Sequence, residues 1–408
     1  MKCRHCGSDV RLPFIDLGSA PPSNAYLTED ALRGPERWYP LKVMVCTECW
    51  LVQTEDYAHS SELFSKDYAY FSSFSSTWLK HAGDYVDFIC KRFQLDSNSL
   101  VVELASNDGY LLQYVKARGI PCFGIEPTAS TARVARDKGI EVHEEFFDVE
   151  LAQKLAAAGR SADLIVANNV LAHVPDINDF VRGISLLLKT AGVVTFEFPH
   201  LLNLVSDNQF DTIYHEHYSY LSLAAVTRIL QRNGLTVFDV EEHPTHGGSL
   251  RVFARRMDDG RKEISENVVR IASKEIQAGI KTADFYTGFQ SQAEGVKNGI
   301  LGFLLNARQS NKTVAAYGAA AKGNTLMNYA GIRSDLIQFV VDRNPAKQSK
   351  FMPGSRIPIV DEDRLRKSKP DFVMILPWNL KSEIAHQIDY VRGWGAKIVT
   401  AIPHLEIA

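Results

Sequence analysis

The stretch Val101-Val102-Glu103-Leu104-Ala105-Ser106-Asn107-Asp108-Gly109 decides the fold of this chain. Its first residues have the apolar character of a buried strand, and a turn of small and polar residues leads into a helical pattern over residues 110–117. Small residues let the backbone pass close to a ligand, and the start of a helix offers N–H groups to its polar end. The turn lacks the G-x-G-x-x-G spacing, which counts against a dinucleotide. We predict that Glu103, Ala105, Asn107 and Gly109 contact a nucleotide-type ligand.

Residues 1–75 are loop-rich, and from Ser99 onward strands and helices alternate. The pattern predicts strands at 100–104, 121–125, 163–167 and 192–198, with helices at 110–117, at 129–138 and after Pro175. Alternation at this spacing indicates a mainly parallel, doubly wound sheet, in which ligands bind beyond the carboxyl ends of the strands. A second α/β pattern occupies residues 313–400, and residues 258–307 form a helical connector. At 408 residues the chain is long enough for two or three domains, and we place them at 1–75, 76–257 and 258–408.

The composition narrows the class of protein. Hydrophobic residues make up 45% and charged residues 23%, as in a globular protein, and the formal net charge is −3. That charge argues against a general nucleic-acid-binding surface. The chain opens without an apolar signal region, and no run approaches ~18 uninterrupted apolar residues. We therefore expect a cytoplasmic protein that binds neither nucleic acid nor membranes.

Four of the six cysteines form two pairs with a two-residue gap, Cys3/Cys6 and Cys46/Cys49. Such a gap lets both thiolates of a pair reach one tetrahedral ion. The intervening loop is longer than in common zinc ribbons, and four reduced cysteines without metal are the alternative. We predict a structural zinc ion, since all four coordination positions would be taken by protein.

Further polar residues end the strands beside the cofactor turn. Glu126 follows the second strand, where a carboxylate can accept both hydroxyls of a ribose; a solvated loop charge is the alternative. Phe147 is a candidate to stack on an adenine, although aromatic residues there are as often simple core. Asn168 and Asn169 follow the strand at 163–167 and place polar side chains over the same pocket. Together with the turn, these residues resemble the S-adenosylmethionine site of a class I methyltransferase, with Ala105 where that family has glycine.

The run from Phe210 to Tyr220 concentrates titratable side chains and contains Tyr214, His215, Glu216 and His217. Methyl transfer to carbon needs a base that removes a C–H proton next to a carbonyl group. Histidine titrates near neutral pH, a neighbouring carboxylate can orient it, and a tyrosine can donate to the developing enolate. An exposed polar loop is the alternative. We predict an acid–base site in which Glu216 orients the histidine.

The whole chain resembles one family, the three-domain sugar C-methyltransferases of deoxysugar biosynthesis. The resemblance is carried by seven motifs in order: the zinc knuckles, Ser106-Asn107-Asp108-Gly109, Glu126-Pro127, Ala172-His173-Val174-Pro175, Tyr214-His215-Glu216-His217, His246-Gly247-Gly248-Ser249-Leu250-Arg251 and Tyr317-Gly318-Ala319-Ala320-Ala321-Lys322. It implies an α/β protein with a zinc module, a Rossmann-like methyltransferase sheet and a second Rossmann-like domain. It further implies that the middle domain binds S-adenosylmethionine and that the C-terminal domain helps to hold a dTDP-linked 4-keto-deoxysugar.

The resemblance also assigns roles to single residues. It makes His217 the base, with Glu216 beside it and Tyr214 as the alternative base, and it places His173 in the sugar pocket. His246 and Arg251 of the glycine-containing motif are assigned to substrate binding.

The C-terminal turn supports a substrate role on its own chemistry. Gly318–Gly323 opens a helix and carries Lys322, which suits a diphosphate; Asp342 and Asn379 follow later strands. A structural lysine and a capping carboxylate are the alternatives.

We therefore expect a monomeric or weakly dimeric enzyme that methylates a carbon of a nucleotide-linked ketosugar. The rival interpretations are a nucleotide-sugar oxidoreductase that uses the Tyr317–Lys322 turn and a zinc-ribbon nucleic-acid adaptor.

Overall fold

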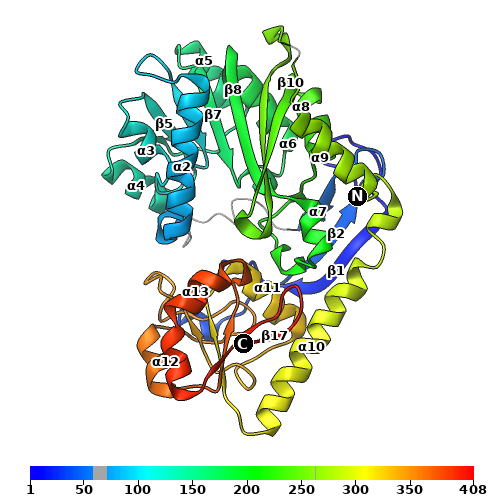
Figure 1. The fold of residues 1–408 in the computed structure, drawn as a ribbon, viewed down its shortest axis with the longest axis vertical. Helices are drawn as coiled ribbons and strands as arrows, with labels where there is room; N and C mark the ends of the chain where they lie inside the picture. Colours follow the sequence, from blue (N-terminus) through cyan, green and yellow to red (C-terminus); the bar gives the residue numbers. More distant parts are fainter. Residues whose placement is uncertain (58–70, 262) are drawn as a thin grey trace.

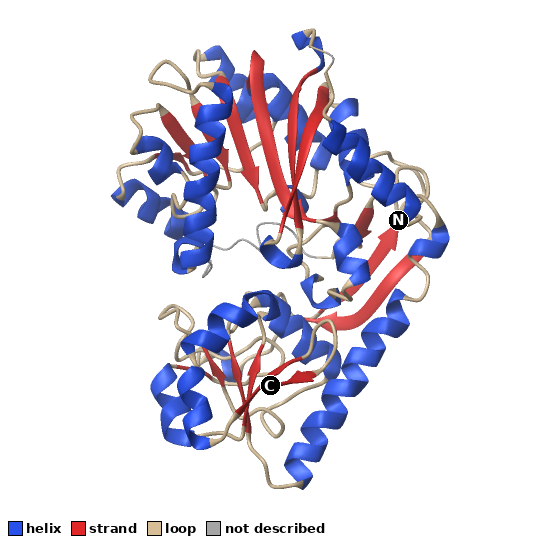
Figure 2. Ribbon diagram, viewed as in Figure 1, coloured by secondary structure: helices blue, strands red, loops and turns tan. Residues whose placement is uncertain are grey.

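Three separate β-sheets organise the chain (Figures 1 and 2). They are seen in a computed structural model that describes residues 1–57, 71–261 and 263–408, so residues 58–70 of the first expected domain lie outside the described part. Figure 1 shows the largest sheet at the top and the C-terminal sheet below it, with the N-terminal strands beside both. Across the described ranges, no helix is both long enough and apolar enough to cross a membrane.

The central sheet has seven strands in the order β10-β11-β8-β7-β4-β5-β6. Five of them are parallel, and β10 and β11 add an antiparallel hairpin at one edge. Their bounds are β4 (Val101–Leu104), β5 (Cys122–Ile125), β6 (Glu141–His143), β7 (Ala162–Asn168), β8 (Leu188–Pro199), β10 (Leu235–His243) and β11 (Ser249–Arg256). The predicted doubly wound sheet is confirmed, and β6, β10 and β11 are additions to the predicted strands.

Both faces of the central sheet are buried, which explains its continuous apolar strands. Val101 packs in one core cluster, and the next residue, Val102, packs in a second cluster on the opposite face. Helices α2 (Ser76–Phe93), α3 (Leu112–Lys116) and α4 (Ala129–Asp137) cover the first face. Helices α5 (Val149–Ala157), α6 (Ile177–Leu187) and α8 (Leu223–Arg232) cover the second.

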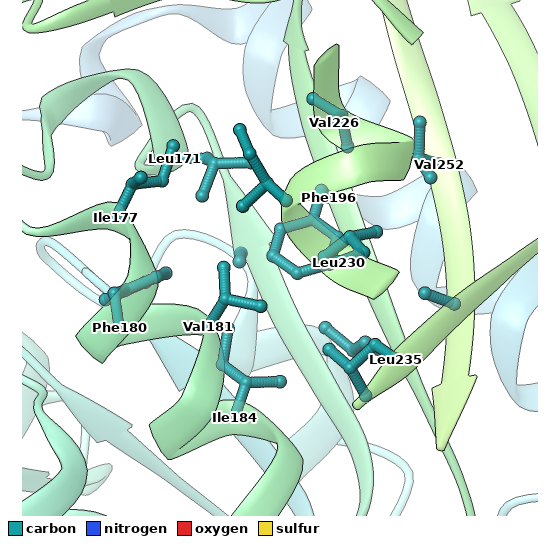
Figure 3. Close-up of a cluster of buried hydrophobic side chains, with 14 of the residues drawn as sticks. Leu171, Ile177, Phe180, Val181, Ile184, Phe196, Val226, Leu230, Leu235 and Val252 are labelled. Carbon is teal, nitrogen blue, oxygen red and sulfur yellow. The ribbon is translucent and has the colours of Figure 1, made fainter. Parts of the chain in front are cut away.

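The second cluster shows how α6 and α8 pack on the central sheet (Figure 3). Val181 and Ile184 of α6 lie beside Phe196 of β8, and Leu230 of α8 reaches toward the same strand. All four side chains are fully buried. Burial of a side chain of this size contributes about 1.5–3 kcal/mol, so this cluster fixes the strands that end at the candidate site.

The C-terminal sheet has six strands in the order β14-β13-β12-β15-β16-β17, and only β17 is antiparallel. Its strands are β12 (Val314–Tyr317), β13 (Val340–Val341), β14 (Ile359–Val360), β15 (Phe372–Ile375), β16 (Lys397–Thr400) and β17 (Glu406–Ile407). Its helices are α11 (Ala321–Ala330), α12 (Glu362–Ser368) and α13 (Lys381–Gln387). The predicted second Rossmann-like sheet is confirmed.

The connector contains α9 (Glu266–Gln277) and α10 (Phe289–Gln309), and α10 runs along one side of the C-terminal sheet (Figure 1).

The N-terminal segment, predicted to be loop-rich, contains three strands. It forms an antiparallel sheet from β1 (Leu12–Ala20), β2 (Tyr39–Val45) and β3 (Val52–Thr54), to which the middle of the chain adds β9 (Ser219–Tyr220). Register shifts interrupt the β1–β2 pairing at two places. Such shifts break the alternation by which a strand is recognised in a sequence.

The same sheet has no closed core of its own. Phe14 of β1 stacks on Phe289 of α10 with ring centroids 4.5 Å apart, whereas Met44 of β2 belongs to the core of the central sheet. The N-terminal module therefore joins the other two sheets rather than standing apart.

Candidate active site

The turn after β4 is held in an unusual backbone conformation. Ala105, Asn107 and Gly109 all have positive φ, at 53°, 49° and 74°. For alanine this region costs of order 1–3 kcal/mol, and such strain is characteristic of ligand sites. A Cβ atom on Gly109 would lie 2.5 Å from the Cδ1 atom of Ile140. Glycine therefore suits this position, because of its positive φ and because Ala135 of the neighbouring helix would lie 3.2 Å from the added atom.

Glu126 ties this turn to the end of β5. Its buried carboxylate accepts hydrogen bonds from the backbone N–H groups of Asn107 and Thr128, each at 2.9 Å. Burial raises the Glu126 pKa, and the bonds from Thr128 and Asn107 oppose that rise. The carboxylate is thus fixed beside the turn, where the ribose contact was predicted.

Several buried polar atoms around the turn support a ligand site. Within the described residues, hydrogen-bond partners are missing for the side-chain oxygens of Ser106 and Asn168 and for one carboxylate oxygen of Asp108. Burial also raises the pKa of Glu103 well above its usual value. Buried polar atoms are rarely left unpaired, so this donor and acceptor set fits the polar end of a bound cofactor.

Phe147, the predicted stacking partner of an adenine, packs against the core of the central sheet. Its ring packs edge-on against Phe180 of α6, with centroids 5.5 Å apart, and it borders the central core. The neighbouring Phe146 is half exposed. This placement corresponds to the core alternative, and an adenine contact for Phe147 stays a prediction.

His217 is oriented by a backbone carbonyl group. Its Nδ1 atom lies 2.8 Å from the carbonyl oxygen of Thr212, which can only accept, so Nδ1 carries the hydrogen and donates. In the neutral ring the Nε2 atom is then unprotonated. His173 is held in the same way, with Nδ1 donating to the Glu216 carbonyl oxygen at 2.7 Å. Both imidazoles are thus fixed in the tautomer that a base requires.

The electrostatics of this cluster favour neutral imidazoles. Burial, together with the nearby His173, lowers the His217 pKa well below its usual value, and burial lowers the His173 pKa to about 4. The two ring centroids are 4.6 Å apart, and the Tyr214 ring lies 3.9 Å from that of His217. At neutral pH His217 is therefore unprotonated and lies next to a phenol, as the predicted acid–base site requires.

Glu216 does not orient His217, which corrects the predicted arrangement. Its buried carboxylate faces the N-terminal module, where the backbone N–H and side-chain amide of Asn24 both donate to it at 3.2 Å. The Thr212 carbonyl fills the expected orienting role. Sequence reasoning missed Thr212 because the contact is made by a main-chain atom, which any residue could supply.

The acid–base loop is attached to the N-terminal module by strand pairing. Val52 pairs with Tyr220, and the N–H group of Thr54 donates to the Tyr218 carbonyl oxygen at 3.1 Å. The Nε2 atom of His215 lies 3.2 Å from the Tyr39 carbonyl oxygen. The module therefore holds the loop that carries His217.

The four paired cysteines fit a zinc ion. Their sulfur atoms all lie within 4.8 Å of one another, with Cys3–Cys49 and Cys6–Cys46 separations of 3.5 Å. Zn–S bonds of about 2.3 Å in a tetrahedron require sulfur separations of roughly 3.8 Å. The side-chain amide of Gln53, on β3, donates to Cys3 at 3.2 Å. The donor set is complete, so the metal would be structural.

The C-terminal sheet contributes Lys322 and Asn379 to the same region. The Lys322 ammonium donates to the Asn379 side-chain oxygen at 2.7 Å and lies 4.6 Å from the centre of the Trp378 ring. The Trp378 indole N–H donates to Asp211, with a shortest distance of 2.9 Å. Asp211 precedes the Thr212 that fixes His217, so the two sheets meet at the candidate base. No sequence pattern predicted the partnership of Asp211 and Trp378.

The glycine-containing motif approaches the same place from β11. A Cβ atom on Gly247 would lie 2.5 Å from Trp378, and its φ of 90° also favours glycine. His246 accepts a hydrogen bond from the side-chain amide of Asn169 at 3.2 Å. Asn169 directly follows Asn168 at the strand end where polar side chains were predicted to lie over the cofactor pocket.

Arg251 and Asp342 have protein partners. Arg251 is buried and pairs with Glu197 at 2.7 Å. Asp342 accepts a hydrogen bond from the Ala319 backbone N–H group at 2.8 Å, as Glu126 does in the central sheet. Substrate contacts for these two residues stay predictions.

The chain matches three family models along its length. Residues 3–64 match a model described as "Putative zinc binding domain", residues 78–240 one described as "Methyltransferase domain", and residues 244–403 one described as "C-methyltransferase C-terminal domain". The curated protein C-methyltransferase NovU from Streptomyces niveus is 34% identical over 402 residues, which are 98% of this chain and 95% of NovU.

Solved methyltransferase structures also align with part of the chain. Magnesium protoporphyrin IX methyltransferase from Synechocystis PCC 6803 with bound SAM aligns with a TM-score of 0.34 and 16% identity, over 44% of this chain and 79% of that chain. An S-adenosylmethionine-dependent methyltransferase from Clostridium acetobutylicum ATCC 824 aligns with a TM-score of 0.35 and 14% identity, over 44% of this chain and 92% of that chain.

Proposed function

Since the chain belongs to the C-methyltransferase family, we propose that it methylates a carbon next to the ketone of a nucleotide-linked 4-keto-deoxysugar. The family, the S-adenosylmethionine-dependent methyltransferase class, the α/β fold class and the two cofactors predicted from the sequence, S-adenosylmethionine and zinc, are confirmed. This enzyme class displaces the oxidoreductase and nucleic-acid adaptor interpretations as the main function. The identity of the substrate, a sugar nucleotide, is proposed.

The observation that supports a carbon acceptor is the state of His217. A methyl group can be transferred to oxygen or nitrogen through an existing lone pair, whereas carbon must first lose a proton. His217 has its Nδ1 hydrogen fixed on the Thr212 carbonyl oxygen, and burial keeps the ring neutral. A base of this kind beside a carbonyl group typically contributes about 10²–10⁴ in rate.

Each residue of the candidate site has a separate role in the proposed reaction. His217 removes the proton beside the ketone, and the C–H electron pair becomes the double bond of an enolate. Tyr214 and His173 border the base and orient the sugar. S-adenosylmethionine, when bound, supplies an electrophilic methyl group. The turn of Ala105–Gly109 and the Glu126 carboxylate would hold it at the ends of β4 and β5.

The zinc module and the C-terminal sheet both contribute to the candidate site. The zinc module holds the acid–base loop through β3 and β9, and the C-terminal sheet brings Lys322, Asp342 and Asn379 as candidate contacts for the nucleotide sugar. We expect a cytoplasmic enzyme that is monomeric or weakly dimeric and acts on a dTDP-linked substrate.

Product analysis tests this function directly. The purified enzyme is incubated with S-adenosylmethionine and a panel of dTDP-4-keto-6-deoxyhexoses, and the products are examined by mass spectrometry and carbon NMR. We expect a new C–CH3 group on at least one ketosugar. Matched dTDP-sugars with a 4-hydroxyl group are the control and should not react, because their C–H protons are not acidic. Methylation on oxygen, or methylation of the hydroxyl controls, would contradict the proposal.

A further inference from the structure

The N-terminal half of α11 packs against the acid–base loop. The Thr325 hydroxyl on this helix donates to the Ile213 carbonyl oxygen at 2.9 Å, one residue before Tyr214. Trp378 holds the same interface through its bond to Asp211. These contacts place Lys322, three residues before Thr325, next to the base rather than at a distant nucleotide site.

The Lys322 ammonium has unusual surroundings for a cation. Its side chain is half-buried, and its hydrogen-bond partner is the neutral Asn379 side chain at 2.7 Å. Within the described residues, no carboxylate forms an ion pair with it. A desolvated cation without an ion-pair partner is costly, and an anion that forms beside it would offset that cost.

This inference rests on the proposed function. We propose that Lys322 is a catalytic residue, which binds the ketone oxygen of the substrate and stabilises the oxyanion formed when His217 removes the neighbouring proton. The C–H electrons form the C=C bond, and the carbonyl π electrons move to oxygen, where the ammonium N–H donates to them. When the enolate carbon takes the methyl group, the S–CH3 electrons leave with sulfur, the carbonyl group re-forms and the His217 proton passes to solvent.

The charges around Lys322 agree with this role. Burial lowers the Lys322 pKa to about 8, and Asp211 opposes that shift. Asp211, His217 and His246 are titratable groups that interact electrostatically with Lys322. The Lys322 charge in turn lowers the pKa of His217 and His246, after burial and, for His217, after His173. At neutral pH the lysine is therefore charged while the base is neutral.

The competing role for Lys322 is a contact to the substrate diphosphate. The two roles differ in what they leave intact when the ammonium is removed. A diphosphate contact acts on binding, and the proton would still exchange at a normal rate in saturated enzyme. An oxyanion contact acts on the transition state, and removal of one such donor costs about 10²–10³ in rate.

Two measurements on Lys322→Met separate these roles. The first is deuterium incorporation from heavy water beside the ketone of a saturating dTDP-4-keto-6-deoxyhexose without methyl donor. The second is the calorimetric Kd of dTDP alone. We expect exchange to fall at least about 100-fold while the dTDP Kd stays within about twofold. The control is Lys381→Met, whose ammonium pairs with Glu406 on the surface and should change neither quantity.

Normal exchange with dTDP binding weakened tenfold or more would overturn the proposal and support the diphosphate contact. If the wild-type enzyme neither exchanges protons of any ketosugar nor methylates one, the proposed function itself fails. The two failures are thereby distinguished. Should Lys322→Met not fold, Lys322→Arg decides by its pH profile. Wild-type exchange should decline above a pH of about 8 as Lys322 loses its proton. Arginine should remove that decline, and a decline that persists in Lys322→Arg would overturn the proposal.

Discussion

Glu126→Gln should weaken cofactor binding without unfolding the protein. The carboxylate of Glu126 is 4% exposed and receives two backbone N–H groups at 2.9 Å. The Thr128 hydroxyl also donates to it, and the carboxylate lies beside the turn where the ribose hydroxyls are predicted. Loss of a charge-assisted hydrogen bond costs about 1.5–3 kcal/mol. At 1.4 kcal/mol per tenfold change, the Kd of S-adenosylmethionine should rise roughly 10- to 150-fold.

The same substitution has a separate cost in stability. A glutamine offers one oxygen, so one of the two N–H groups, on Asn107 or Thr128, faces an amide NH2 group instead of an acceptor. A buried donor without its acceptor costs about 1–3 kcal/mol, which a melting curve of the ligand-free protein would detect. Calorimetry at a temperature well below that melting point isolates the binding effect.

Glu144→Gln is the matched control. Glu144 follows β6 on the same side of the sheet, but its carboxylate is exposed and pairs with Arg136 at 2.8 Å. An exposed pair contributes about 0.2–1 kcal/mol, and cofactor affinity should stay unchanged. If folded Glu126→Gln binds S-adenosylmethionine within about twofold of wild type, the ribose contact lies elsewhere and this account of the cofactor site is refuted.

Three further predictions concern the rest of the fold. Metal analysis should find about one zinc ion per chain, Cys46→Ser should give poorly folded protein, and active protein without zinc would contradict the metal site. Gly247→Ala should lose about 1–3 kcal/mol of stability and reduce turnover, because the new Cβ atom meets Trp378; Gly299→Ala, with open space around it, should be neutral in a melting assay. Burial raises the Glu197 pKa, but His81 and Arg251 lower it by more, so that it falls from 4.5 to about 2. This carboxylate therefore stabilises the fold above a pH of about 4.5, by about 3 kcal/mol, and acid titration of unfolding should show that stability lost as the pH falls toward 2. A Glu197→Gln variant with the same acid profile as wild type would contradict the assignment.

The sheet and the zinc site could be predicted because their signals are local. A buried strand followed by a turn of small residues requires no knowledge of distant contacts, and the two-residue gap in Cys3/Cys6 already fixes which sulfurs can share an ion. The carboxylate of Glu126 was found for the same reason, since parallel strands end at one edge.

The parts that could not be predicted depend on contacts between distant segments. Glu216 follows His215 in a loop, and only its pairing with Asn24, 192 residues away, turns its carboxylate toward the N-terminal module. The orienting carbonyl of Thr212 and the indole of Trp378 carry no signature of their roles in the sequence. The β9 strand has two residues and is defined by its partner β3.

The central claim is that His217 removes a proton beside a ketone, and deuterium exchange in heavy water without methyl donor tests it most directly. His217→Asn is the sharpest variant, because its side-chain N–H can still donate to the Thr212 carbonyl oxygen while it offers no base. The account predicts that exchange falls by about 10²–10⁴ while S-adenosylmethionine and dTDP still bind, and that Tyr214→Phe retains exchange. Normal exchange in His217→Asn together with its loss in Tyr214→Phe would contradict the account and make Tyr214 the base.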